Sequence, residues 1–221
     1  MNLRPLFWPL WFAGLALFGV MAGFAAVASR FPGDLAVTEW VQGIDGLSRL
    51  ADAVNAAGDF PLTLAVTLVS LAWLALTRRF IEGSFIVLSF VPRALREAIS
   101  ALVARPRPGA ELVDVRDEAA GFSFPSGHVV GAMVLYGLLF YLLQVCVPRR
   151  ELRAPLQIVA AFVMLAAGPA RVYVGVHWPS DTVGGYLYGA LALALLILGY
   201  RRVKRQFQPA GFIRREIRPL R

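Results

Sequence analysis

The chain has 221 residues, of which 58% are hydrophobic and only 16% are charged, with a formal net charge of +8. Soluble domains are about 45–50% apolar and about 25% charged, so this composition excludes an ordinary soluble domain and indicates a membrane protein. The single cysteine, Cys146, excludes a disulfide within one chain.

A helix of about 20 residues crosses the hydrocarbon layer of a bilayer, and several apolar segments approach or exceed that length. They are predicted, in chain order, at 6–28, 60–77, 81–104, 126–147, 155–173 and 180–200. The first is longer than the apolar part of a secretory signal and is interpreted as a membrane span. In the third, Pro92 is expected to kink the helix because proline lacks a backbone N–H. The predicted fold class is therefore all-α, a six-transmembrane-helix bundle forming one domain over residues 1–205.

The connection between the first and second predicted spans has an amphipathic pattern. Apolar residues recur at helical spacing from Val37 to Val54, and most charged residues of this segment fall on the opposite face. The pattern predicts an interfacial amphipathic helix lying in the plane of the membrane surface. An ordinary connector that never contacts substrate is the alternative interpretation.

Basic residues gather on one side of the predicted bundle, in the loops after the second and fourth spans and after the last span. Positively charged loops face the cytoplasm, so both termini are expected there, in a membrane of the bacterial cytoplasmic (inner) type. The opposite loops carry most of the acidic residues and are expected to face the periplasm or exterior. Segment 206–221 is predicted to be a basic cytoplasmic tail whose partners are anionic membrane lipids and not nucleic acid.

Three short segments at the expected extracytoplasmic ends hold residues that are costly to place in a membrane. They are Arg105-Pro-Arg107-Pro after the third span, Pro125-Ser-Gly-His128 at the start of the fourth, and Arg171 through His177 to Asp181 leading into the sixth. Both histidines of the chain belong to these segments. Because the three segments can meet at one end of an up-and-down bundle, an active site is expected there.

These residue types suit phosphoryl transfer. The guanidinium fork of arginine matches phosphate oxygens, which makes Arg107 and Arg171 candidate phosphate-binding residues. Ser126 and Gly127 begin a helix, and the free backbone N–H groups at such a start form an anion site. Arg105 is open to a second interpretation, as a solvated charge of the loop.

Histidine can attack phosphorus when its other ring nitrogen is held by an acceptor. Asp181 follows His177 by four residues, in the first turn of a helix, so we assign His177 as the nucleophile and Asp181 as its orienting partner. His128 is then the candidate that protonates the leaving oxygen and later activates water. A structural histidine at the membrane interface is the alternative for His128.

The motifs Arg107-Pro108, Pro125-Ser126-Gly127-His128 and Arg171-X5-His177-X3-Asp181 resemble the three-part signature of the type 2 phosphatidic acid phosphatase superfamily, which also contains vanadium haloperoxidases. The resemblance implies a metal-independent phosphatase without a cofactor, a phosphohistidine intermediate, and a lipid phosphate or diphosphate substrate. Two positions depart from the family pattern: Ser100 stands where the family usually has lysine, and Ala170 where it usually has serine.

The missing lysine removes a cation from the expected phosphate site. Arg96 lies one helical turn before Ser100 on the same face, and we consider it a replacement cation that reaches past the small serine. The alternative is that Arg96 bridges Glu97 or a backbone carbonyl. The candidate phosphate-binding residues are therefore Arg107, Arg171, Ser126 and Gly127, with Arg96 and Ser100 as further hypotheses.

The expected function is a membrane phosphohydrolase that acts on a lipid at the extracytoplasmic face. A compact chain without added domains resembles the polyprenyl (undecaprenyl) diphosphate phosphatases of the family, with phosphatidate, phosphatidylglycerol phosphate and lipid A phosphate as other candidates. A lipid headgroup phosphotransferase using the same histidines is one alternative. A catalytically silent lipid-binding or transport protein is another, and the oligomeric state is left open.

Overall fold

The computed structural model describes residues 4–207, which form nine α-helices and no strand. In chain order the helices are α1 (Arg4–Val27), α2 (Asp34–Gln42), α3 (Ser48–Gly58), α4 (Phe60–Leu76), α5 (Phe80–Leu88), α6 (Val91–Val103), α7 (Gly127–Cys146), α8 (Arg150–Tyr173) and α9 (Pro179–Phe207). The all-α class predicted from the sequence is confirmed. Residues 208–221 of the predicted basic tail lie outside the described residues, and α9 includes its first two residues.

Between residues 4 and 207, four helices are long and apolar enough to cross a membrane, namely α1, α7, α8 and α9. The pair α3 and α4 supplies a fifth candidate if these two helices, bent by 57° around Asp59, form one broken span. The structure therefore supports four or five spans, and the count of six stays a prediction. The segment that decides the count is 81–104, which was predicted as one span.

Segment 81–104 is divided because α5 ends at Leu88 and α6 begins at Val91. Pro92 lies in the first turn of α6, where its missing N–H needs no helical partner, so the helix ends and restarts where a kink was predicted. Arg96 and Ser100 of α6 are buried inside the protein. The polar face of α6 is thereby directed at the interior instead of at lipid.

The predicted interfacial helix is also divided. It forms α2 and α3, which are separated by a turn that contains Gly46 at φ 80°, a backbone conformation that favours glycine. Ala51 and Val54 of α3 pack against Ala170 and Tyr173 near the end of α8. The amphipathic pattern correctly indicates the buried face of α3, whereas the prediction of one continuous helix is wrong.

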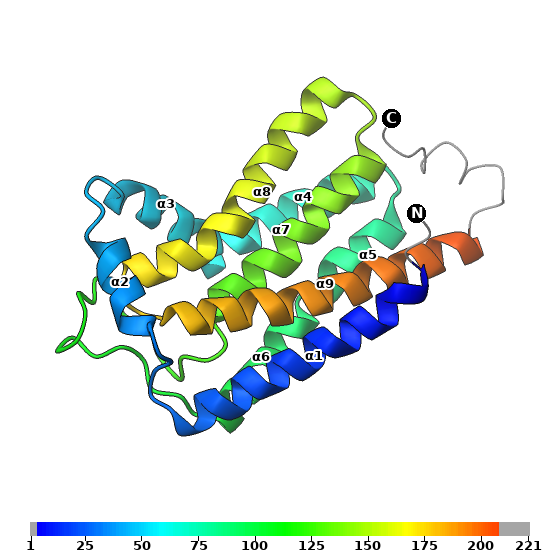
Figure 1. Cartoon of the computed structure of the whole chain (residues 1–221). Helices are drawn as coiled ribbons and strands as arrows, with labels where there is room; N and C mark the ends of the chain where they lie inside the picture. Colours follow the sequence, from blue (N-terminus) through cyan, green and yellow to red (C-terminus); the bar gives the residue numbers. More distant parts are fainter. Residues whose placement is uncertain (1–3, 208–221) are drawn as a thin grey trace.

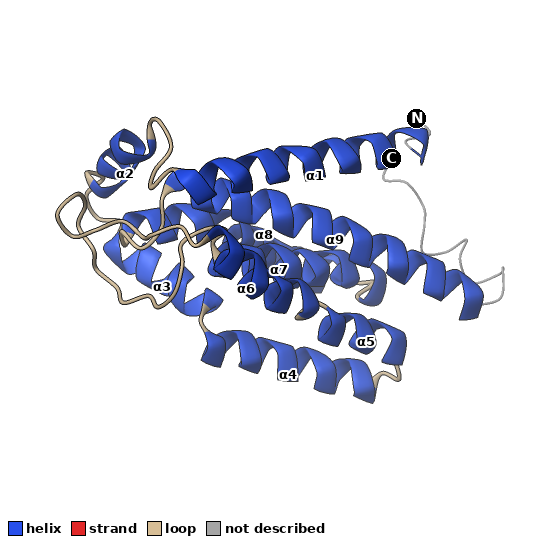
Figure 2. Ribbon diagram, turned by 90° about the horizontal axis from the view of Figure 1, so that it is seen from below, coloured by secondary structure: helices blue, strands red, loops and turns tan. Residues whose placement is uncertain are grey.

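Helix α7 lies at the centre of the bundle and packs against α8 and α9. Its buried residues Val130 and Val134 form a core with Leu196 of α9. A small residue is needed where α9 approaches α7, because a Cβ on Gly185 would lie only 3.0 Å from the Cβ of Val129. Figure 2 shows α1 and α4 along opposite flanks of this core, and both carry exposed apolar side chains that suit contact with lipid.

The two ends of the bundle are formed by different segments of the chain. Figure 1 shows α2, the loop 104–126 and the start of α9 at one end, whereas the start of α1 and the end of α9 lie at the other. The three motif segments belong to the end with α2 and the long loop, as expected for helices that run up and down. Residues far apart in the chain are thus brought together there.

Candidate active site

Backbone hydrogen bonds connect the three motif segments. Helix α6 ends at Val103. Ala104 follows in the left-handed region at φ 52°, and the chain turns there into Arg105. The Ser123 N–H donates to the Arg105 carbonyl at 2.8 Å, and the Ser126 N–H donates to the Asp181 carbonyl at 3.1 Å. The loop before α7 is therefore held against both of the other segments.

His177 lies in the short connection between α8 and α9 and is 2% exposed. Arg107 Nη1 lies 3.0 Å from its Nε2, and Ser123 Oγ lies 3.4 Å from its Nδ1. Because a guanidinium can only donate, Nε2 must carry the lone pair and Nδ1 the proton. This tautomer leaves the lone pair on Nε2, on the side of Arg107.

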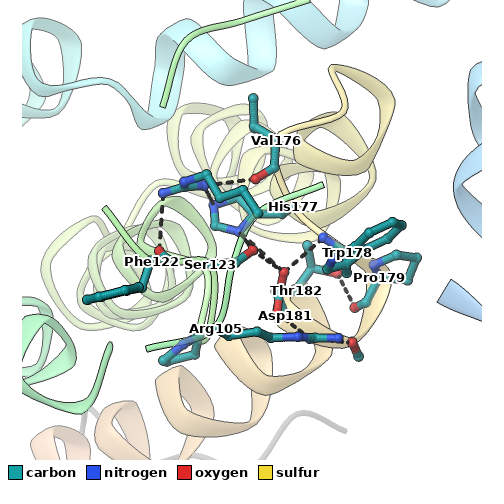
Figure 3. A network of polar contacts seen from close by, with 12 residues as sticks. Arg105, Phe122, Ser123, Val176, His177, Trp178, Pro179, Asp181 and Thr182 are labelled. Carbon is teal, nitrogen blue, oxygen red and sulfur yellow. Dashed lines mark hydrogen bonds and ion pairs between the residues drawn. The ribbon is translucent and has the colours of Figure 1, made fainter. Parts of the chain in front are cut away.

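Asp181 is completely buried in the first turn of α9. Its Oδ2 accepts hydrogen bonds from Ser123 Oγ and, at 2.8 Å, from the Trp178 N–H. The same oxygen lies 3.7 Å from His177 Nδ1, within ion-pair range but too far for a hydrogen bond. Figure 3 shows Ser123 beside both groups. Asp181 is therefore next to His177, as expected from their spacing, and the serine bridges them.

His177 is neutral at ordinary pH. Burial lowers its pKa to about 4, Asp181 acts in the opposite direction, and the charges of Arg107 and Arg171 add to the lowering. The pKa of Arg107 is lowered to about 10, first by burial and then by the charges of Arg171 and Arg96, so Arg107 remains a cation at neutral pH. An uncharged ring surrounded by guanidinium groups is suited to attack an anionic phosphate group.

A cavity of about 660 Å³ opens at the site, and its walls include Arg107, Asp117 and Val176. The side chain of Arg107 is held at the wall by hydrogen bonds from Nε to the Gly121 carbonyl at 3.1 Å and from Nη2 to the Ala120 carbonyl at 2.9 Å. These contacts fix the guanidinium beside His177. The cavity connects this guanidinium with the outside of the protein.

Arg171 Nε and Ser126 Oγ are among the few side-chain polar atoms of the described residues that are buried without a hydrogen-bond partner. Arg171 is 2% exposed, and its Nη1 donates to Asp117 at 2.9 Å. Buried polar atoms are nearly always paired, so unpaired ones in a cluster of cations indicate a binding place. Phosphate oxygens are acceptors, which suits both atoms.

His128 lies in the first turn of α7, where it was expected, but its closest polar partner was not predicted. Its Nε2 lies 2.8 Å from Oδ1 of Asp59, at the junction of α3 and α4. Gly58 permits this approach, because a Cβ there would lie 2.8 Å from His128 Cδ2. The charge of Arg171 acts on both His128 and His177, so the two histidines lie around the same guanidinium.

Arg96 braces the turn that precedes α7. Its Nε donates to the Pro125 carbonyl at 2.6 Å, and its Nη2 donates to the Phe122 carbonyl at 3.3 Å. Its Nη1 donates to both carboxylate oxygens of Glu97 at 3.0 Å. These contacts are the ones expected if Arg96 bridges Glu97 and backbone carbonyls, so its direct contact with phosphate stays a proposal.

Two small residues, Ser100 and Gly127, lie close to Arg96 or its partners. Ser100 is 3% exposed, and its Oγ donates to the Phe122 carbonyl at 3.5 Å. A Cβ on Gly127 would lie 3.3 Å from Arg96 Cζ, so the first turn of α7 touches the guanidinium. The charge of Arg96 also acts on Arg107. Arg96 is thus within electrostatic range of the predicted phosphate site although its donors are bound to other acceptors.

Arg105 is not a solvated charge of the loop. It is 1% exposed and forms ion pairs with Asp181 at 2.5 Å and with Asp34 at 3.0 Å. The solvated interpretation is wrong because the start of α2 and the start of α9 each supply a buried carboxylate to this side chain. Figure 3 shows the Arg105 side chain extended along Asp181, on the side away from His177.

Comparison with known proteins decides the family. The family model described as PAP2 superfamily matches residues 83–205, which is more than half of the chain. The chain belongs to the PAP2 superfamily. The resemblance inferred from the motifs is thereby confirmed, and the protein is a membrane phosphatase of the PAP2 type, a hydrolase.

Individual PAP2 relatives agree with this assignment. The chain is 29% identical to phosphatidylglycerophosphatase B of Bacillus subtilis (strain 168) over 163 residues, which cover 72% of this chain and 78% of the relative. Its fold is similar to the crystal structure of the first transmembrane PAP2 type phosphatidylglycerolphosphate phosphatase from Bacillus subtilis, with a TM-score of 0.76, 23% identity, and coverage of 90% of this chain and 98% of that one. It is also similar to Aquifex aeolicus LpxE, with a TM-score of 0.57, 21% identity, and coverage of 74% and 93%.

Ser123, Asp59 and Arg105 are among the residues that converge here without being signature residues of the PAP2 motifs. Nothing in the spacing of Ser123 or Asp59 indicates a role, because each meets its histidine only through tertiary packing. The position of Arg105 did indicate that it needs a partner, because an arginine at the end of an apolar segment is costly unless a carboxylate or water accompanies it. The sequence alone could not say which of the two it is.

Proposed function

We propose that the protein hydrolyses a terminal phosphate group of a membrane lipid through a phosphohistidine at His177. The observation that carries the proposal is the geometry of this histidine. Its buried neutral ring directs Nε2 toward Arg107 and Nδ1 toward Ser123 and Asp181. A nucleophilic nitrogen and an oriented cationic site are the two elements that phosphoryl transfer requires.

In the first step, His177 Nε2 attacks phosphorus, and the bond between phosphorus and the lipid oxygen breaks. His128 gives its proton to that oxygen, while Arg107, Arg171 and the first amides of α7 stabilise the charge on the other oxygens. Asp181 stabilises the positive charge that the His177 ring gains when the N–P bond forms. In the second step, His128 takes a proton from water, the water oxygen attacks phosphorus, and inorganic phosphate leaves His177.

Phosphatidylglycerol phosphate is the first substrate to test, because the relative from Bacillus subtilis is named phosphatidylglycerophosphatase B. Undecaprenyl diphosphate, which the compact chain favoured, stays a candidate together with phosphatidate and lipid A phosphate. All four lipids offer a terminal phosphate group to the same guanidinium groups. The catalytic residues therefore suit each of them, and a direct comparison of substrates is required.

The function is tested by measuring phosphate release from these four lipids in mixed micelles with purified protein. We expect release without any acceptor lipid, and inhibition by vanadate, which mimics five-coordinate phosphorus. A phosphotransferase would release little phosphate until an acceptor lipid is added. Binding of all four lipids without release from any would indicate a silent lipid-binding protein and would overturn the proposal.

We also propose that the site faces the periplasm or exterior of the inner membrane, on the basis of the basic loops at the opposite end. In a Cys146→Ala background, a cysteine at Ala119 should react with an impermeant thiol reagent in intact cells. A cysteine at Leu152, which is 58% exposed at the start of α8, should react only after permeabilisation. The reverse labelling pattern would place the active site in the cytoplasm.

Arg96 provides a further prediction, because we propose that it supplies the cation that lysine provides in relatives. Arg96→Ala should lower turnover per folded molecule by about tenfold or more, the range typical of losing a charged group near the transition state. Adding Ser100→Lys to this variant should restore part of the activity if both positions serve one phosphate subsite. Phosphate release and the melting temperature are measured in parallel.

Glu97→Gln is the matched control for Arg96→Ala. It removes the carboxylate that accepts from Arg96 Nη1 and leaves the guanidinium in place. Turnover close to that of the wild type is expected. If Arg96→Ala instead lowers only the melting temperature, or if Ser100→Lys restores nothing, Arg96 is a structural brace of the turn before α7 and the cation hypothesis is wrong.

A further inference from the structure

Four of the five N–H donors of the Arg105 guanidinium have acceptors in the protein. Its Nη1 donates to Asp181 Oδ1 at 2.5 Å and to Ser180 Oγ at 2.8 Å. Its Nη2 donates to Asp34 Oδ2 at 3.0 Å, and its Nε donates to a backbone carbonyl at 3.2 Å. The side chain is fully buried. Arg105 is therefore enclosed by the protein, whereas Arg107 lines the cavity.

Asp34 is enclosed in the same way. It is the first residue of α2 and is 4% exposed. Its Oδ1 accepts from the Ser180 N–H at 2.9 Å, and its Oδ2 accepts from Ser180 Oγ at 2.7 Å and from the Phe31 N–H at 2.6 Å. The carboxylate thus joins the start of α2 to the start of α9. It holds Arg105 in place with contacts that do not involve Asp181.

Asp34, Arg105 and Asp181 form one buried charged group. Two carboxylates, Asp34 and Asp181, share the single guanidinium of Arg105, so the buried group keeps a net negative charge. Without Asp34, the guanidinium would act on Asp181 alone and a smaller negative potential would reach His177. Without Arg105, two carboxylates would be buried with no cation between them, which is strongly unfavourable.

We infer that Arg105 and Asp34 are positioning residues, which hold Asp181 in place and set the charge that it presents to His177. The inference rests on the proposed role of His177 as the nucleophile. Neither residue lines the cavity beside Arg107. Asp34 lies outside the three motif segments, and Arg105 belongs to the first of them without being a signature residue. Their effect is passed on by Asp181, which lies within ion-pair distance of the His177 ring and shares a hydrogen bond with Ser123.

Kinetics test the first part of the inference. Asp34→Asn keeps the shape of the side chain, and we expect it to lower kcat about tenfold, as is typical when an outer partner of a functional side chain is changed. KM and the inhibition constant of vanadate should stay within about twofold, because the phosphate ligands are untouched. Arg105→Gln should lower kcat further. In the double variant, kcat should recover relative to Arg105→Gln, because Asp181 alone restores the net charge that the wild-type group has.

A spectroscopic measurement tests the second part without any lipid substrate. The chain has two histidines, so ¹⁵N-histidine NMR in micelles, with His128→Gln for assignment, follows the His177 ring directly. The other charged groups near this ring are Asp181 on α9, Arg107 in the loop and Arg171 on α8. Asp34→Asn should lower the pKa of His177 and Arg105→Gln should raise it, each by about one unit. The double variant should return close to the wild-type pKa.

Opposite shifts of the His177 pKa would not follow from a purely structural role, which predicts lower melting temperatures only. The matched controls are Asp114→Asn and Arg116→Gln, which break an exposed pair of the same kind in the loop 104–126 and should leave kcat and the His177 pKa unchanged. An unchanged His177 pKa in Asp34→Asn and Arg105→Gln, or a rise in KM with kcat constant, would overturn the positioning role. Absence of phosphate release by the wild type would instead contradict the proposed function.

Discussion

His177→Ala is expected to abolish phosphate release while leaving the protein folded. The substitution removes the nitrogen that we propose to form the covalent intermediate, and loss of a nucleophile typically lowers kcat by more than about 10³-fold. The ring is buried, but within residues 4–207 its polar contacts are to Arg107, Ser123 and Asp181 alone, so the bundle itself does not depend on it. Phosphate release and the melting temperature are measured on the same micellar sample.

Asp181→Asn is the informative companion of this variant. It keeps the imidazole and removes only the charge that stabilises the cationic ring, so a smaller loss of turnover is expected than for His177→Ala. Trapping with radiolabelled lipid phosphate should give an acid-labile, base-stable phosphoprotein in the wild type and none in His177→Ala. Residual turnover of His177→Ala within about tenfold of the wild type would show that another group attacks phosphorus.

The long apolar helices could be predicted from the sequence because hydropathy and length alone determine them. The predicted segment 126–147 corresponds to α7 within one residue at each end, and 180–200 lies inside α9. Segment 81–104 could not be resolved in this way. Whether Pro92 kinks or ends the helix depends on where Arg96 finds partners. Its Nη1 pairs with the adjacent Glu97, but its Nε and Nη2 donate to carbonyls of the turn before α7, which spacing along the chain does not predict.

The candidate site likewise combines contacts that the spacing of residues predicts with contacts that depend on tertiary packing. His177 and Asp181 are four residues apart, so one helical turn suffices to predict that they meet. Asp59 precedes a proline-led helix and would be taken for a helix cap, yet its side chain makes no capping hydrogen bond and contacts His128 instead. Such a contact depends on the bend between α3 and α4 and on the absence of a side chain at Gly58. A contact that depends on tertiary geometry in this way cannot be predicted from the spacing of residues along the chain.

His128→Ala is expected to stop turnover at both steps, because in the proposed mechanism the same ring protonates the lipid oxygen and later activates water. Removal of a general acid or base typically lowers the rate by about 10²–10⁴-fold. The two steps can be separated with p-nitrophenyl phosphate, whose leaving group departs without a proton. With this substrate His128→Ala should still release a first equivalent of nitrophenol, and the phosphoprotein should accumulate because its hydrolysis lacks a base.

This burst distinguishes His128 from His177 in one experiment, since His177→Ala should give neither the burst nor the phosphoprotein. Asp59→Asn is the matched variant for the contact at 2.8 Å to His128 Nε2. If Asp59 orients the His128 ring, Asp59→Asn should lower turnover of the lipid substrate more than the burst of nitrophenol, because only the lipid oxygen needs the proton. Should His128→Ala show no burst and no trapped phosphoprotein, His128 is required for phosphate binding itself. The assignment of the acid and base role to His128 would then have to be abandoned.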